Sequence, residues 1–442
     1  MKAKRIIAVI ASAAMLLTAA APAAGAKSVG DIDYTIVNPY ETVDWNTWDY
    51  YKANLHTHST ASDGKVPLDE MVELYYDAGY DILSMTDHGV VNYGWNLPRK
   101  TNGIFNFFRK VTPMSQEDYD RITTGSDRNG RGMVDVTGGI EINMAVLTKT
   151  HVNGYFTEYG QGEWGKENDY RSAVAEVDKA GGYTVLNHVG DWVNSNNFPE
   201  RSHWDVYINY FAKIFNDYHT CLGMEIKNNT DNCTRADRAL WDELLQVVIP
   251  KGRNIWAFAD DDSEYPDEVG RSFEYFVLPE NTEANVKTAM ENGTFFACSR
   301  YEKSLDDKSN FEGNGNVPLV KNIIVDQEEN TIELVLDKTR DCREIQWVAN
   351  GAVISNSAKI DLNDFEGMIG CYVRFRLLGE GGVTYSQAFE VKYSTRNDKE
   401  IPETAWIFET AYGKLFLKLF RSIPFAIVQV LVEKIADWTG II

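Results

Sequence analysis

The sequence predicts an α/β protein built on a barrel of parallel strands, followed by a smaller domain of β-strands only. From residue 52 to residue 305, short apolar runs typical of strands alternate with amphipathic segments of helical period. This alternation recurs often enough to suggest that the parallel sheet closes into a barrel. Beyond residue 318 the strand-like runs continue with turn signals and without helical segments, which favours a small β-sandwich.

Composition and periodicity divide the chain into six segments. They are a signal peptide (1–26), an N-terminal lead-in (27–51), the barrel domain (52–305), a linker (306–317), the β-sandwich (318–396) and an amphipathic, apolar helical tail (397–442). The signal peptide has a basic start with Lys2, Lys4 and Arg5, an apolar run at 6–17 and small residues at 24–26. That run is too short to span a bilayer, so we expect export, with the protein secreted or associated with the cell envelope.

The elements of the barrel domain follow from local pattern. Strand-like runs occur at residues 52–58, 81–86, 134–137, 151–156, 183–186, 222–226, 254–258 and 272–278. Amphipathic helices are expected at 67–80, 170–180, 235–248 and 282–292. In barrels of this kind the functional residues lie at the C-terminal ends of the strands.

The run at 52–58 carries the first candidate metal ligands. His56 and His58 lie two residues apart, so on a strand they project from the same face. Asp63 follows in a Ser/Asp/Gly turn. Two imidazoles and a carboxylate aimed at one point form a metal-binding arrangement, although paired histidines of this spacing also occur on exposed strands.

Further imidazoles and carboxylates lie at the ends of the other strands. They are His88, Glu141, His151, His188, Asp260 and Asp262. Each alone also fits a structural role, such as a turn cap, an edge carboxylate or part of a solvated loop. Because five of the seven histidines lie near strand ends, we expect one metal centre there. His203 and His219 lie in a helical, aromatic-rich region and are expected to be structural.

As an ordered set, these motifs resemble the polymerase and histidinol phosphatase (PHP) superfamily. The motifs are His56-x-His58 with Asp63-Gly64, Thr86-Asp87-His88, Gly139-x-Glu141, Asn187-His188 and Asp260-x-Asp262. The resemblance covers about residues 52–299 and implies a distorted (β/α)7 barrel with two or three metal ions that hydrolyses phosphoesters.

The resemblance also implies a ligand set for each metal. His56, His58, Glu141 and Asp260 would hold the first metal, Glu141 with His151 and His188 the second, and Asp63, His88 and Asp262 the third. The residues expected to carry catalysis are His56, His58, Glu141, His188 and Asp260.

The last motif departs from the family pattern, which is Asp-x-His. On an extended strand end Asp260 and Asp262 share a face, so the ligand position survives with oxygen in place of nitrogen. Oxygen ligands favour manganese, iron or magnesium over zinc. We therefore expect two to three divalent ions (Mn, Fe, Mg or Zn, with Mn and Fe favoured), and the third site is the least secure.

This site predicts an exported metal-dependent phosphoesterase acting on a phosphomonoester or phosphodiester. Paired metals lower the pKa of a bridging water and hold the phosphoryl oxygens during in-line attack. Two alternatives stay open: a metal-dependent hydrolase of a non-phosphate bond, and a non-catalytic metal-binding surface module. Asp87 either orients a ligand imidazole or caps the adjacent turn.

Charge restricts the partners. The chain has 43 basic and 65 acidic residues, a formal net charge of -22, which disfavours nucleic acid except as a short oligonucleotide substrate. The long segment 89–133 is locally basic. We expect its Arg99, Lys100, Arg109 and Lys110 to bind a small anionic, phosphorylated substrate, the alternative being a packed surface excursion.

Two further features remain. In the tail, Lys414, Lys418 and Arg421 recur at helical spacing beside apolar residues. The tail is expected to dock on the protein or a partner, or to lie in a membrane interface at the cell envelope. Among the five cysteines, Cys342 and Cys371 are the pair most compatible with a disulfide, because both lie in the β-rich region.

Overall fold

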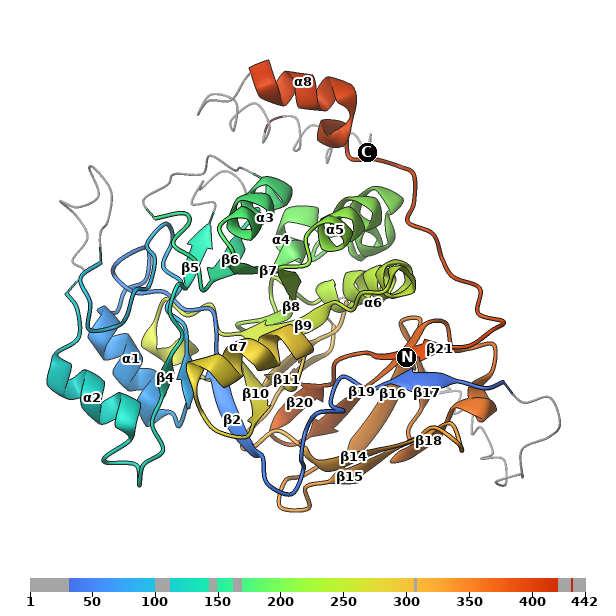
Figure 1. The fold of residues 1–442 in the computed structure, drawn as a ribbon, viewed down its shortest axis with the longest axis horizontal. Coiled ribbons are helices and arrows are strands. Elements are labelled where there is room, and N and C mark those ends of the chain that lie inside the picture. Colours follow the sequence, from blue (N-terminus) through green and yellow to red (C-terminus); the bar gives the residue numbers. More distant parts are fainter. Residues whose placement is uncertain are drawn as a thin grey trace, which may run out of the picture.

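The computed structural model describes residues 32–99, 112–142, 149–161, 169–305, 308–419 and 431. The expected signal peptide lies outside these residues, as do Lys100, Arg109 and Lys110. The described chain is a mixed α/β fold, with the helices outside the strands of the N-terminal half and a β-rich C-terminal half beside it (Figure 1).

Two sheets form the framework of the N-terminal half. In the first, β2 (Asp49–Asn54), β3 (Ile82–Leu83) and β4 (Val134–Asp135) are parallel. The second has the order β5 (Ile140–Ile142), β6 (Val152–Tyr155), β7 (Tyr183–Leu186), β8 (Cys221–Asn228) and β9 (Trp256–Asp260). Every strand predicted in this half from the sequence is present, at somewhat different bounds.

The expectation of an all-parallel sheet is wrong at β6, which runs antiparallel to both β5 and β7. The connection at residues 143–151 is shorter than the dozen or more residues that a parallel crossover needs. The reversal places the start of β6 beside the ends of its neighbours, because Val152 pairs with both Ile142 and Leu186. His151 therefore lies at the same edge of the sheet as the C-terminal ends of β5 and β7.

Among the described residues, no continuous ladder joins the two sheets into a closed barrel. Isolated bridges connect them instead. Thr57 pairs with Ser263 beyond the end of β9, and His88 pairs with Glu141 on β5, both in the parallel sense. These bridges bring the segments that follow β2 and β3 against the second sheet.

Amphipathic helices cover the strands. Those predicted from the sequence are α1 (Leu68–Asp77), α3 (Tyr170–Lys179), α6 (Asp237–Val248) and α7 (Glu283–Asn292). Those not predicted individually are α2 (Gln116–Thr124), α4 (Val189–Val193) and α5 (Asp205–Asp217). Short 3-10 helices occupy Pro199–His203, Ile249–Lys251, Pro266–Glu268, Leu362–Phe365 and Ile407–Glu409. In α3 the buried residues Tyr170, Ala173, Val174 and Val177 form one stripe against the sheet, and the Asp169 side chain caps its first turn.

The C-terminal strands continue the first sheet rather than forming an isolated unit. It has eleven strands and also contains β1 (Thr35–Val37), β10 (Ser272–Leu278), β11 (Phe295–Ser299), β16 (Glu344–Ala349), β17 (Ala352–Ser355), β19 (Tyr372–Gly379), β20 (Gly382–Tyr385) and β21 (Phe389–Lys392). The junction is the antiparallel pair β11 and β20.

A three-stranded sheet packs on this C-terminal part. It consists of β14 (Val320–Asp326), β15 (Thr331–Leu336) and β18 (Lys359–Asp361). Ile323 and Leu334 share one core with Trp347, Phe375 and Phe389 of the larger sheet. The segment expected to be a linker contains β13 (Asn310–Glu312), which forms a hairpin with β12 (Tyr301–Lys303).

The tail contains α8 (Ala411–Leu419), which lies beyond the helices of the N-terminal half in Figure 1. The segment that precedes α8 packs on the N-terminal half through Trp406. The centroid of its ring lies 5.4 Å from that of Trp192. No described helix has the length and apolarity needed to cross a membrane. All five cysteines are free, so Cys342 and Cys371, the pair most compatible with a disulfide, are not joined.

Candidate metal centre

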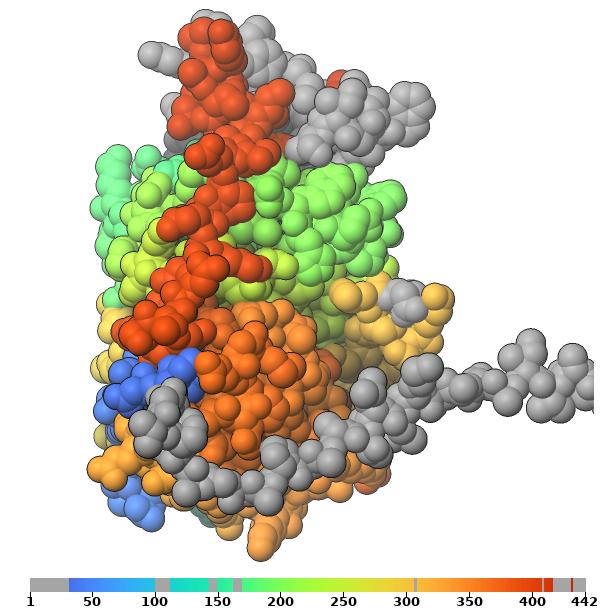
Figure 2. Space-filling model, turned by 90° about the vertical axis from the view of Figure 1, so that its right-hand side faces the viewer, coloured from blue at the N-terminus to red at the C-terminus, as the bar shows by residue number. Residues whose placement is uncertain are grey.

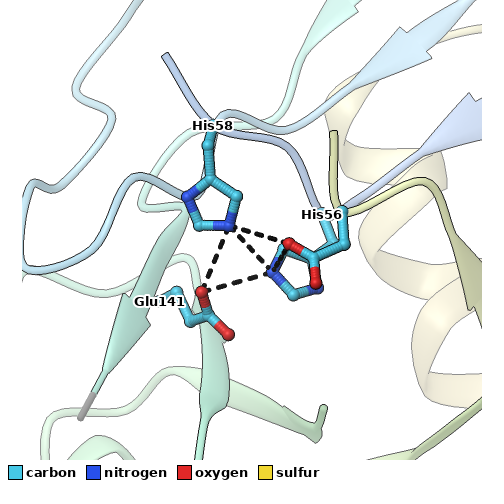
Figure 3. A group of neighbouring side chains, drawn as sticks. His56, His58 and Glu141 are labelled. Carbon is cyan, nitrogen blue, oxygen red and sulfur yellow. Dashed lines mark hydrogen bonds and ion pairs between the residues drawn. The ribbon is translucent and has the colours of Figure 1, made fainter. Parts of the chain in front are cut away.

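His56 and His58 lie in the segment that follows β2, and their rings converge. Their Nε2 atoms are 3.2 Å apart, and both side chains are buried, with exposed fractions of 0% and 2% (Figure 3). The His58 N–H donates to the carbonyl oxygen of Ser263, which ties this segment to the end of β9. The two-residue spacing thus aims both imidazoles at one point.

Glu141 on β5 lies opposite this pair. Its Oε2 atom is 3.3 Å from His56 Nε2 and 3.2 Å from His58 Nε2 (Figure 3). The same oxygen is 3.2 Å from Nδ1 of His88. This short distance follows from the isolated β-bridge that pairs the backbones of His88 and Glu141.

The second oxygen of Glu141 faces two more imidazoles. Oε1 is 3.2 Å from Nδ1 of His151 and 3.6 Å from Nε2 of His188. The side-chain amide of Asn187 donates to Oε1 at 2.7 Å, which fixes the carboxylate in place. Five imidazoles therefore surround one buried carboxylate.

Asp262, and not Asp260, completes the first ligand group. Its Oδ1 atom lies 3.2 Å from His56 Nε2 and 3.0 Å from His58 Nε2. The strand ends at Asp260 and Asp262 has a φ of 47°, so the two side chains do not share a face as an extended strand end would require.

Asp260 has a different environment from the one predicted. Its Oδ1 atom accepts the N–H of Leu55 at 2.5 Å, and Oδ2 is buried without a hydrogen-bond partner among the described residues. Burial and the nearby Glu225 raise the pKa of Asp260 to about 8. It belongs to none of the ligand groups that the described residues form.

Asp63 lies at the exposed side of the centre. Its oxygens are 3.5 Å from His58 Nδ1 and 3.4 Å from His88 Nε2. The described residues form three groups in which the possible ligand atoms lie within 4.8 Å of one another. They are His56, His58, Glu141 and Asp262; His58, Asp63 and His88; and His88, Glu141 and His151.

Sequence reasoning missed Glu225 on β8. Its Oε1 atom lies 2.7 Å from His56 Nδ1, and Oε2 accepts the His188 N–H at 2.7 Å. His188 has a φ of 27°, a strained conformation for a non-glycine residue that this hydrogen bond helps to hold. The signal was present, because Glu225 is the one charged residue in the otherwise apolar run 221–226.

The contact with Glu225 determines the tautomer of His56. A neutral imidazole carries one N–H, and the neighbouring carboxylate favours its position on Nδ1. The Nε2 atom then presents a lone pair toward the oxygens of Glu141 and Asp262. Lone pairs facing one another at 3.2–3.3 Å repel unless a proton or a metal ion lies between them. This mixture of nitrogen and oxygen donors fits a divalent metal ion.

The electrostatics of the centre favour positive charge. Burial opposes protonation of His56, but the carboxylates of Asp262, Glu141 and Glu225 outweigh it and raise its pKa well above the usual value. Burial likewise opposes ionisation of Glu141, yet the surrounding imidazoles hold its pKa well below the usual value. The same field that retains a proton here attracts a divalent cation.

Asp87 supports the turn that carries Asp63. It accepts the N–H of Ser59 at 2.7 Å and the hydroxyl of Ser62 at 2.8 Å, and that hydroxyl lies 3.2 Å from His58 Nδ1. Asp87 therefore caps the turn and, through Ser62, orients His58.

Of the predicted anion-binding residues, the structure describes only Arg99. Its guanidinium is buried and donates to Asp87 and to the side-chain oxygen of Asn92, each at 2.7 Å. Arg99 thus stabilises the support of the turn. Lys100, Arg109 and Lys110 lie outside the described residues.

One side of the centre is open. The side chains of His56 and Glu141 are 0% and 1% exposed, whereas those of Asp63, Asp262 and His151 are 45%, 25% and 21% exposed. A ligand would reach the centre from this side.

The family model of the PHP domain matches residues 54–254. Residues 54–254 are a PHP domain. The match contains every residue of the candidate ligand groups except Asp262, which lies beyond its end, in the motif that departs from the family pattern. No curated protein matches the chain.

Solved structures with distant likeness include three bacterial proteins. A two-domain protein from Bacteroides vulgatus, containing a predicted PHP-like metal-dependent phosphoesterase, is 15% identical with a TM-score of 0.40, and the alignment covers 84% of this chain and 93% of that one. A candidate metal-dependent phosphoesterase from Bifidobacterium adolescentis is 12% identical (TM-score 0.28; 48% and 88% covered). An amidohydrolase from Chromobacterium violaceum, solved with sulfate and without metal, is 13% identical (TM-score 0.29; 54% and 95% covered).

Proposed function

We propose that this PHP domain is a metal-dependent phosphoesterase that hydrolyses a phosphomonoester or phosphodiester. The observation that carries the proposal is the environment of Glu141: one buried carboxylate contacted by five imidazoles, with Asp262 on the same face as His56 and His58. This mixture of nitrogen and oxygen ligands suits divalent manganese or iron.

Two ions that share Glu141 agree best with the ligand groups. His56, His58 and Asp262 would hold one, and His88 and His151, with His188 nearby, would hold the other. A third ion at Asp63 would have to share His58 and His88, so its occupancy depends on the other two. When bound, such ions supply Lewis acidity toward phosphoryl oxygens and lower the pKa of water.

The chain's own residues keep this centre ready for substrate. Glu225 holds the His56 ring with its Nε2 lone pair facing inward, and Asn187 holds Glu141. The carboxylates of Asp63 and Asp262 border the open side and repel an anionic substrate. Binding of such a substrate therefore depends on the metal ions or on cationic groups at that side. The basic residues Lys100, Arg109 and Lys110 are our candidates for those groups.

We also propose that the two sheets are the interrupted wall of a distorted (β/α)7 barrel. The bridges between Thr57 and Ser263 and between His88 and Glu141 support this, because they lie where the missing ladders would run. Export to the cell envelope, with the tail contacting the protein surface or a membrane interface, remains part of the proposal on sequence grounds.

The test is hydrolysis by the purified chain lacking residues 1–26. With added manganese, we expect turnover of p-nitrophenyl phosphate or bis(p-nitrophenyl) phosphate, and loss of turnover in His56→Ala and Glu141→Gln. The matched control is His203→Ala, because that ring is 54% exposed and pairs with Glu243 rather than with a residue of the metal centre. Hydrolysis of neither ester by the manganese-loaded protein would favour the non-catalytic alternative.

A further inference from the structure

A second cavity lies away from the metal centre, where α6, the hairpin of β12 and β13, and the face of β16 and β19 meet. Its volume is about 600 Å³, in the range of small-molecule sites. In Figure 2 the gold hairpin stands beside the orange C-terminal strands and below the green helices, and the surface is hollowed between them. We call this cavity the hairpin cleft.

Arg374 on β19 forms part of the wall of the hairpin cleft and has unused hydrogen-bonding capacity. The residue is 4% exposed. Asp242 on α6 accepts from its Nε at 2.8 Å and from NH2 at 2.7 Å, and the ring of Trp241 lies 4.9 Å from the guanidinium carbon. Its NH1 group is buried and has no partner among the described residues. A guanidinium fixed on one edge and unpaired on the other can receive an oxyanion.

Arg376 is two residues further along the same strand and therefore on the same face. Its Nε donates to Gln346 at 2.5 Å and NH1 donates to Glu302 at 3.2 Å. No bond to its NH2 group is made by the described residues. Two guanidinium groups thus lie on one wall, and each has an N–H group that no described residue accepts from.

The rest of the lining indicates a ligand with an apolar part. Leu305, Phe311 and Val353 border the cleft and are 42%, 39% and 44% exposed. Five cationic side chains and three carboxylates line it, a positive excess within a chain whose formal net charge is -22. Local positive charge on an acidic protein selects anions.

We propose that the hairpin cleft is a binding site for a small ligand that carries a carboxylate or a phosphate on an apolar group. Arg374 and Arg376 bind the oxyanion, and the three exposed apolar side chains contact the remainder. The site shares no ligand residue with the metal centre, so it does not depend on the proposed hydrolase activity.

Calorimetric titration of the full mature chain without added metal tests this site. The probes are benzoate and phenylphosphonate, with benzyl alcohol as the neutral counterpart. We expect at least one anion to bind saturably and the alcohol not to bind; which anion binds distinguishes a carboxylate ligand from a phosphate ligand. Arg376→Gln should weaken binding about tenfold or more, because a charge-assisted hydrogen bond is lost.

Two control variants make the result specific. Arg343→Gln removes a cation that is 60% exposed and pairs with Asp341 and Glu380 outside the cleft, and it should leave binding unchanged. His56→Ala should also leave binding unchanged, because the metal centre is separate. The proposal is overturned if neither anion binds, if benzyl alcohol binds equally well, if Arg376→Gln has no effect while its thermal unfolding matches the parent, or if His56→Ala abolishes binding.

Discussion

The proton on His56 Nδ1 decides which nitrogen of that ring can bind a metal. Glu225 lies 2.7 Å from this nitrogen and is itself held by the His188 N–H and the amide of Asn228. This carboxylate therefore couples the orientation of two predicted ligands, one on each side of Glu141. A residue that orients a ligand from another strand, as Glu225 does, belongs to no recognisable sequence motif. Its position beside the ligand depends on how distant strands pair.

Glu225→Gln should weaken manganese binding about 10- to 100-fold, since the amide no longer fixes the His56 tautomer. Calorimetric titration with manganese measures the effect. Glu243→Gln is the control, because Glu243 pairs with the exposed His203. Equal affinities in Glu225→Gln and the parent would show that this contact does not support the site.

The structure places Asp262, rather than Asp260, in the first ligand group, and this gives a second prediction for single residues. Asp262→Asn should reduce manganese content, because one charged oxygen ligand of the first group is lost. Asp260→Asn should have a much smaller effect, because Asp260 accepts the Leu55 N–H and belongs to none of the ligand groups that the described residues form. Elemental analysis of both variants after dialysis checks this; the reverse order would restore Asp260 as a ligand.

At the scale of elements, the centre is assembled from strand ends, and most of it could be predicted from the sequence. The two-residue spacing of His56 and His58 and the position of Glu141 follow from local pattern. The reversal of β6 and the left-handed turn at Asp262 could not be derived from periodicity, because both depend on tertiary pairing. Close packing also restricts Gly64, in the turn after His58. A Cβ atom there would lie 2.8 Å from backbone atoms of His58 and Ser59.

Asp135 on β4 supplies a pH-dependent test of element packing. It accepts the Trp95 N–H and the Asn92 amide, each at 2.7 Å, and burial raises its pKa to about 7. Between about pH 4 and pH 7 the folded state holds this proton more tightly than the unfolded chain, so its contribution to stability falls as the pH rises. The stability of the parent relative to Asp135→Asn should therefore decrease from pH 4 to pH 7.

Urea unfolding midpoints of the two proteins at pH 4.5, 6 and 7.5 measure this difference, in about the window set by the two pKa values. A parent-to-variant difference that is constant across these pH values would contradict the assignment of a raised pKa to Asp135.

At the scale of the whole molecule, the N-terminal half and the C-terminal strands form one folded unit through the pairing of β11 with β20. Asp242 and Arg374 join α6 to β19 by a buried ion pair at 2.7 Å. Sequence periodicity predicted strands after residue 318, but it could not show that they extend a sheet begun by β2 and β10, because partner choice leaves no local signal.

This continuity predicts that residues 27–317 do not fold independently. Removing the later strands exposes the edge of β11 and the apolar side chains of Phe296 and Val317. The fragment should be aggregated or lack a cooperative thermal transition, as judged by circular dichroism and light scattering. A monomeric fragment that melts cooperatively near the temperature of the full chain would contradict a single unit.

The most direct test of the central claim is anomalous diffraction from a crystal of the chain lacking residues 1–26, soaked in manganese. We expect peaks about 2.0–2.3 Å from the Nε2 atoms of His56 and His58 and from an oxygen of Asp262, with Glu141 between two ions. Density at these side chains without an anomalous peak, in a crystal that binds manganese elsewhere, would contradict it.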